Sequence, residues 1–304
     1  MSTKYDEHNK YHRFARSVAI TAVSLVVFLC IWWLVSKVAD NAAIPEPVET
    51  FSALFSLIQN GDAVTGLPLS TYISSSLTKF LSGFLLALAI ALPLGLILGN
   101  FKTIREFTNP WIEVLRPIAP IAWAPIFILL FGYIQGATFV VFVGIFFPLL
   151  TNIVFGVSKI DRVLVDASKT LGASNLQIFT KVLIPSTVPY LMNGIKVGLG
   201  IGWMCIVAAE LYATPLGGIG FYVANMITYG AFPQAYAGII IIAVLGLLTT
   251  GLAEYVSKRV SKRMGMDVRC PRARSRSKAR NGARSAYAPT APTSFTRTYP
   301  RARP

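Results

Sequence analysis

Long apolar runs alternate with short polar segments along most of this chain. The runs that approach or exceed the length of a bilayer-spanning helix lie at about 18–37, 72–99, 117–134, 137–157, 188–211 and 235–256. A helix needs about 20 predominantly apolar residues to cross a bilayer. The pattern therefore predicts an all-α integral membrane protein with six transmembrane helices.

The third apolar run, 117–134, contains Pro117, Pro120 and Pro125. Proline removes a backbone donor, so this helix is expected to be kinked or locally unwound. Irregular backbone at membrane depth is tolerated only where protein or a water-filled path satisfies its polar groups. We therefore expect the third run to border a translocation path.

The fifth run combines a small-residue face with an acidic residue. Gly194, Gly198 and Gly202 recur every fourth residue, which lets another helix approach closely. Glu210, at the end of the run, could pair with a basic group, cap a gate or reach outer headgroups, and Lys79 and Lys196 are expected to snorkel to an interface. The candidates for a translocation path or gate are Pro120, Pro125, Gly198, Gly202 and Glu210.

Composition supports a membrane protein and excludes several kinds of chemistry. Of 304 residues, 54% are hydrophobic and 13% are charged, against about 25% charged in soluble domains. The cysteines Cys30, Cys205 and Cys270 show no metal-binding spacing, and both histidines lie in the polar N-terminal arm. No phosphate-binding glycine loop of the Walker A type occurs. We expect a chain that is not an enzyme and binds no metal or cofactor directly.

The charges between the runs predict the orientation of the chain. Basic residues gather at 102–116, 159–181 and 258–263, whereas segment 40–70 is acidic and segment 212–232 is uncharged. Cytoplasmic loops carry the excess of Lys and Arg. Both termini are therefore expected in the cytoplasm, with Lys37 as the one dissenting charge.

Polar segments flank the predicted six-helix domain, 17–263, at both ends. Residues 1–16 form a short cytoplasmic arm. The tail, 264–304, holds ten of the 28 Lys and Arg residues from Arg269 onward and no periodic apolar face, so it is expected to be disordered. Attraction to anionic lipid or nucleic acid is one interpretation. An incidental appendage is the favoured one, and no nucleic-acid partner is predicted.

Segment 161–185 is the longest charged, amphipathic stretch between the runs and predicts two short helices. Asp161 can cap the first, and Ser174 with Gln177 has capping-box spacing for the second. Gly172 between them tolerates the left-handed conformation that often ends a helix. Pro185 is expected to end the second helix and redirect the chain.

These residues also resemble a known motif. Asp166-Ala167-Ser168, Gly172 and the ending Val182-Leu183-Ile184-Pro185 are similar to the EAA loop of ABC importer permeases, with Asp for Glu and Ser for the second Ala. The resemblance implies a cytoplasmic coupling helix between the fourth and fifth crossings that sits in a groove of an ATPase subunit. It assigns this contact to Asp166, Ala167, Ser168, Leu171, Gly172, Leu176 and Pro185. The alternative is an amphipathic helix on the membrane surface.

The fifth run from Gly194 to Glu210 and the following Gly217-Gly218-Ile219-Gly220 resemble the nitrate/sulfonate/taurine branch of these permeases. The resemblance implies a type I importer permease in the cell (inner) membrane, paired with a second copy and with ATPase subunits that hold ATP–Mg. It also implies an external solute-binding protein that delivers a small oxyanion such as a sulfonate, taurine, nitrate or bicarbonate. The alternative is a self-sufficient channel or secondary transporter, which would need more ionisable residues near the membrane midplane.

Overall fold

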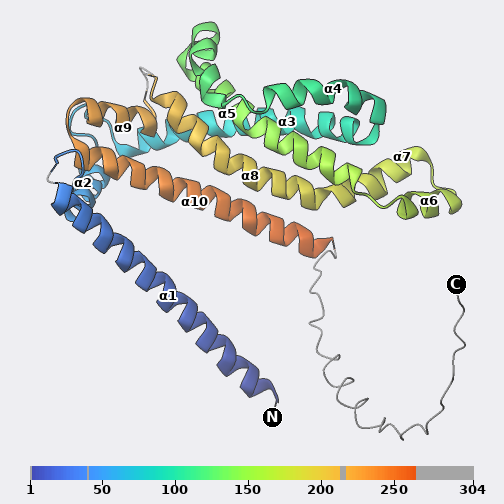
Figure 1. Ribbon diagram of the computed structural model, residues 1–304, viewed down its shortest axis with the longest axis horizontal. Helices are drawn as coiled ribbons and strands as arrows, with labels where there is room; N and C mark the ends of the chain where they lie inside the picture. Colours follow the sequence, from blue (N-terminus) through green and yellow to red (C-terminus); the bar gives the residue numbers. More distant parts are fainter. Residues whose placement is uncertain (1, 40, 213–216, 265–304) are drawn as a thin grey trace, which may run out of the picture. The chain divides into compact units, whose positions relative to one another are not determined.

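The computed structural model describes residues 2–39, 41–212 and 217–264, and all regular structure in them is helical (Figure 1). The elements are α1 Ser2–Ala39, α2 Pro47–Asn60, α3 Leu69–Asn100, α4 Lys102–Leu115, η1 Pro120–Trp123, α5 Ala124–Ser158, α6 Arg162–Thr170, α7 Asn175–Ile178, the π-helical turn η2 Phe179–Leu183, α8 Ile184–Glu210, α9 Ile219–Thr228 and α10 Phe232–Arg263. The predicted all-α class is confirmed. The predicted tail lies outside the described residues except for its first position.

Five helical stretches of the described chain are long and apolar enough to span a membrane, where the sequence predicted six. They are Val18–Ala39, Leu69–Asn100, Pro120–Ser158, Asn175–Glu210 and Phe232–Arg263. The third and fourth predicted runs share one of these stretches, but non-helical backbone at Gly132, whose φ of 76° is left-handed, separates them, and the two parts fold back on each other: a Cβ at Gly136 would lie 2.7 Å from Ile128 Cα. Residues 124–131 before the kink are too few to cross a bilayer by themselves.

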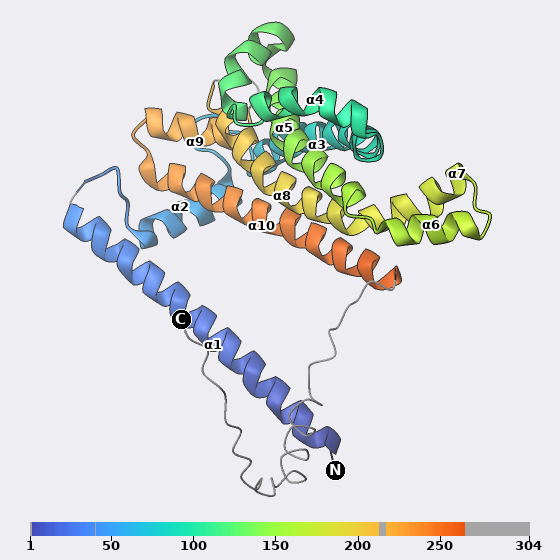
Figure 2. The ribbon, with the colours of Figure 1, turned by 45° about the vertical axis from the view of Figure 1, so that its right-hand side comes forward.

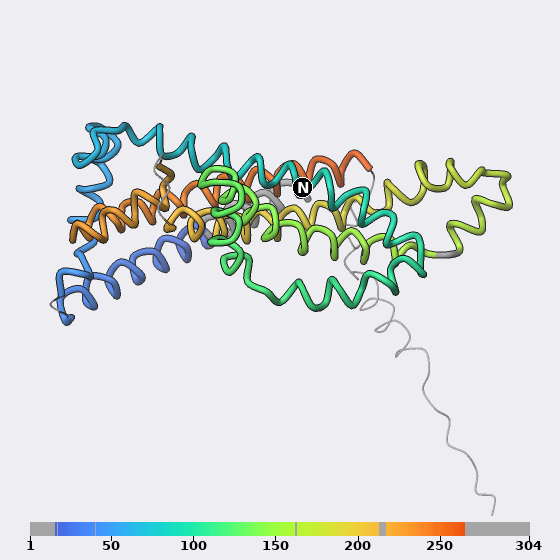
Figure 3. Tube along the Cα trace, turned by 90° about the horizontal axis from the view of Figure 1, so that it is seen from above, coloured from blue at the N-terminus to red at the C-terminus, as the bar shows by residue number. Residues whose placement is uncertain are grey.

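The relative direction of α3 and α5 shows which way the chain between them must run. Gly83, Gly95 and Gly99 of α3 approach Val141, Ile153 and Val157 of α5 in the same order, so the two helices run parallel. The chain between them must therefore lead back along the bundle, and Figure 3 shows α4 taking this return course. Six crossings, with the third at about 117–134, remain a prediction.

Helices α3, α5 and α8 form the main core. Phe80 and Trp203 stack with ring centroids 4.8 Å apart, and Ile145 and Ile206 are fully buried beside them. A Cβ at Gly202 would lie 2.7 Å from Cδ1 of Ile145. The small-residue face of the fifth run is therefore a site of close helix contact between α8 and α5.

Two segments between the predicted runs form helices. Segment 102–115, expected only as a basic loop, is the amphipathic helix α4, with Arg105 donating to the Ser158 hydroxyl. Segment 219–228, inside the expected uncharged loop, is α9. Its residues Tyr222 and Met226 are buried in an apolar cluster with Leu57 and Tyr72. Helix α9 is thus a packed part of the protein.

Lys37, the charge that disagreed with the predicted orientation, forms an ion pair with Glu46. Both side chains are partly exposed, at the end of α1 and just before α2. The positive-inside rule counts Lys and Arg and not net charge, so Lys37 still disagrees with the predicted orientation.

Candidate functional site

Segment 161–178 forms the two short helices that its sequence predicts. The Asp161 carboxylate accepts a hydrogen bond from the Val163 backbone N–H at 2.9 Å and begins α6. The Ser174 hydroxyl accepts from the Gln177 N–H, and the Gln177 side chain accepts from the Ser174 N–H, so the capping box is complete. Figure 2 shows α6 and α7 beyond the ends of α5 and α8.

Gly172 makes the turn between α6 and α7 possible. Its φ of 78° is left-handed, which costs a residue with a side chain roughly 1–2 kcal/mol. The Gly172 N–H donates to the Lys169 carbonyl at 2.9 Å, and the Ala173 N–H donates to the Ser168 carbonyl at 3.0 Å. This is the Schellman pattern of helix ends. No atom lies within 4 Å of where a Cβ would be, so the space beside Gly172 is open.

The α6–α7 segment exposes an apolar surface, which we call the docking face: Val163, Ala167, Leu171 and Leu176. Leu171 is 87% exposed and Leu176 is 72% exposed. Asp166 is exposed on the same helix, whereas the Ser168 hydroxyl donates to the Leu164 carbonyl of its own helix. Val163, Ala167 and Leu171 follow one another at intervals of four residues, the spacing that places side chains on one helix face.

Pro185 does not redirect the chain, contrary to the prediction. Helix α7, the turn η2 and α8 form one continuous helical stretch, Asn175–Glu210. In η2 the backbone widens to π-helical geometry, and the Ile184 N–H donates to the Phe179 carbonyl five residues back. A π-turn accommodates a local disruption without ending the helix, so Pro185 sits in the first turn of α8.

At the other end of α8, Glu210 is fully buried in an ion pair. Lys79 of α3, 3% exposed, donates from Nζ to Glu210 Oε1 at 3.0 Å. The Ser76 hydroxyl lies 2.9 and 2.8 Å from the two carboxylate oxygens. The expectation that Lys79 snorkels to an interface is wrong, because a carboxylate in reach makes burial of the ammonium possible. Lys196, the other snorkelling candidate, is half-buried in α8.

The glycine string that follows α8 fits around this carboxylate. The Gly220 N–H donates to Glu210 Oε2 at 3.0 Å, and the Ile219 N–H donates to the Ser76 hydroxyl at 2.9 Å. A Cβ at Gly218 would overlap the Glu210 carboxyl group. Ser76 was not among the predicted site residues, although its position three residues before Lys79 places both on one face of α3.

Comparison with known proteins identifies the family. Residues 91–262 match the model of the binding-protein-dependent transport system inner membrane component. The chain belongs to this family. It is therefore the permease component of an ABC importer, a multi-pass inner-membrane protein and not an enzyme, which sets aside a self-sufficient channel or secondary transporter.

Two curated relatives and one solved structure agree with this assignment. The permease is 32% identical over 243 residues to the nitrate import permease protein NrtB of Leptolyngbya laminosa, covering 79% of this chain and 86% of that protein. It is 30% identical over 237 residues to the taurine transport system permease protein TauC of Escherichia coli K12, covering 77% and 86%. A chain of the inward-facing MetNI methionine ABC transporter has the same fold, with a TM-score of 0.54 at 19% identity over 63% of this chain and 95% of that one.

The five candidate path residues occupy different surroundings in the permease. Gly198 and Gly202 face Ile145 of α5, and Glu210 is enclosed by α3, α8 and α9. Pro120 begins η1, and Pro125 lies exposed in the first turn of α5. In this conformation the five do not share one open surface.

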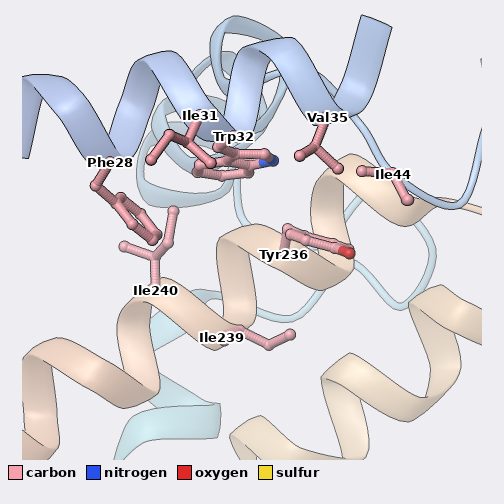
Figure 4. A pocket seen from close by; sticks show the side chains of 8 residues that line it. All are labelled: Phe28, Ile31, Trp32, Val35, Ile44, Tyr236, Ile239 and Ile240. Carbon is pink, nitrogen blue, oxygen red and sulfur yellow. The ribbon is translucent and has the colours of Figure 1, made fainter. Parts of the chain in front are cut away.

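A separate cavity of about 510 Å³ lies between α1 and α10. Figure 4 shows its lining: Phe28, Ile31, Trp32, Val35, Ile44, Tyr236, Ile239 and Ile240. Trp32 and Tyr236 stack across the two helices with ring centroids 6.0 Å apart. This lining offers no charged group, so the cavity is poorly suited to a charged solute.

No group of three or more His, Cys, Asp or Glu side chains within residues 2–39, 41–212 and 217–264 is arranged to hold a metal ion.

Proposed function

We propose that this permease is driven by a separate cytoplasmic ATPase subunit that binds the docking face. The observation that carries the proposal is the exposed apolar surface at Val163, Ala167, Leu171 and Leu176, held in place by the left-handed Gly172. Asp166, Ser168 and Pro185 complete the EAA-like motif around it. Val163, Ala167 and Leu171 lie outside the apolar spans, so their exposed side chains need a protein or membrane-surface partner.

The ATPase partner would carry the nucleotide chemistry. ATP–Mg is expected on that subunit, and this chain would supply the surface that receives the motion. The permease is expected to act with a second copy of itself and with an external solute-binding protein, since its family is defined by dependence on a binding protein. Closure of the paired ATPases would then switch the helices between inward-open and outward-open states.

The cargo we propose is a small oxyanion such as a sulfonate, taurine, nitrate or bicarbonate. The support is the naming of two relatives as a nitrate import permease and a taurine transport permease. We propose that the path runs beside the broken segment with Pro120 and Pro125 and the α8 face of Gly198, Gly202 and Glu210. Broken helices and buried charges persist where protein or water satisfies them.

Co-expression of the tagged permease with a candidate ABC ATPase subunit from the same genome tests the proposed function. We expect the two to co-purify in detergent and the complex, in proteoliposomes, to hydrolyse ATP faster when a loaded binding protein is added. A permease that purifies without an ATPase, or that transports without ATP, would contradict the proposal.

The proposed orientation places both termini and the α6–α7 segment in the cytoplasm. Single cysteines at Phe55, Thr170 and Thr228, all exposed, test it in a background without the three native cysteines. A membrane-impermeant maleimide added to intact cells should label positions 55 and 228, and position 170 only after the cells are opened. Labelling of position 170 in intact cells would contradict the proposed orientation.

A further inference from the structure

Helix α9 begins without a cap of its own. The first backbone N–H groups of a helix have no intrahelical partner, and the residue before α9 is Gly218, which has no side chain to supply one. The missing acceptors come from other helices: Ser76 of α3 accepts from the Ile219 N–H, and Glu210 of α8 accepts from the Gly220 N–H. We call Ser76, Lys79 and Glu210, with Gly218 and Gly220, the outer clamp.

The outer clamp favours a carboxylate in particular. The N-terminal end of a helix carries partial positive charge, which stabilises an anion placed against it. Lys79 neutralises the same carboxylate from α3 at 3.0 Å, so no net charge is buried. Gly218 leaves room for the carboxylate to approach the backbone, because any side chain there would overlap it. Helices α3, α8 and α9 thus meet at the Glu210 carboxylate.

Glu210 is also the last residue of a long uninterrupted helical stretch. This stretch begins at Asn175, beside Leu176 of the docking face, and its 36 residues extend about 54 Å. The π-turn η2 is its one departure from α-helical geometry within the described residues. One continuous helical stretch therefore connects the docking face to the outer clamp.

We propose that Glu210 is a positioning residue that fixes α9 to the end of α8, so that motion of the docking face reaches α9. This inference rests on the proposed function, in which an ATPase moves the docking face. The carboxylate acts by capping α9, and Lys79 acts by allowing that carboxylate to be buried. Helix α9 keeps its apolar contacts through Tyr222 and Met226, so it should remain folded when the cap is removed.

Two double variants separate capping from burial of charge. Lys79→Met with Glu210→Gln removes both charges but keeps a side-chain oxygen that can accept from the Gly220 N–H. Lys79→Met with Glu210→Met removes the charges and the cap, while placing apolar groups of similar size in the core. Neither leaves an unpaired charge, so both are expected to assemble.

The readout is the accessibility of α9 in the assembled complex with its ATPase. A cysteine at Ile227, 49% exposed on α9, is labelled with a maleimide in proteoliposomes, with a cysteine at Val48 of α2 as control and the native cysteines replaced. With wild-type clamp residues, ATP should change the labelling rate at position 227 by about fivefold or more, within the range of typical coupling. The Gln variant should keep this response. The Met variant should lose it while still binding ATPase.

Three results would overturn the inference. They are no response to ATP at position 227 in an active wild-type complex, a response retained in the Met variant, and a response lost in the Gln variant as well. Failure of the ATPase to bind the wild-type permease would instead overturn the proposed function and remove the basis of the inference.

Discussion

Lys79→Met alone should destabilise the permease by about 3–5 kcal/mol, because it leaves the Glu210 carboxylate buried without its countercharge. Glu210 is fully buried and Lys79 is 3% exposed, so water cannot replace the missing partner. We expect a large fall in the thermal unfolding temperature in detergent, or no recoverable folded protein. The measurement is the loss of monodisperse protein after heating, followed by size-exclusion chromatography.

The double variant Lys79→Met/Glu210→Met is the matched control for this effect. It leaves no unpaired charge, so it should unfold well above the single variant, and below wild type only by the cost of the hydrogen bonds lost from the Ser76 hydroxyl and the Gly220 N–H. Glu254→Gln disrupts the exposed ion pair with Lys258 in α10 and should change stability little. A single Lys79→Met variant as stable as wild type would mean that the pair is not buried in the membrane-embedded protein.

Gly172→Val and Ala167→Glu should each uncouple the permease from its ATPase without preventing membrane insertion. Valine at 172 cannot easily adopt the left-handed φ of 78°, at a cost of about 1–2 kcal/mol or a shifted turn. Glutamate at 167 places a charge in the centre of the docking face. We expect at least a tenfold loss of ATPase affinity, equivalent to about 1.4 kcal/mol, measured by titrating the purified ATPase onto each variant.

Gly251→Val is the control for the glycine substitution. Gly251 lies in α10 with helical geometry, and no atom lies within 4 Å of its Cβ position. This variant and the conservative Ala167→Ser should bind ATPase and transport like wild type. If Gly172→Val and Ala167→Glu also bind and transport normally, the α6–α7 segment is not the coupling element and the proposed function loses its main support.

Local signals in the sequence were sufficient for the α6–α7 segment. Asp161, Ser174 with Gln177, and Gly172 each act through backbone groups within a few residues, and all adopt the predicted conformations. The apolar runs likewise indicated an all-α membrane protein, because a helix that crosses a bilayer needs about 20 predominantly apolar residues, although the count of six crossings stays a prediction. The EAA-like spacing led to the family that the comparison confirmed.

Contacts between distant residues were decided only by the tertiary structure. Lys79 and Glu210 are 131 positions apart, and nothing local indicates that they pair or that Ser76 and Gly220 join them. The chain folds back between the third and fourth runs at the left-handed Gly132, and the helix continues through Pro185 because a π-turn precedes it, which α-helical rules do not anticipate. Helix caps and turns set by local backbone preferences could thus be predicted from the sequence. The partners of the buried charges and the course of the helices could not be predicted, because packing between helices determines both.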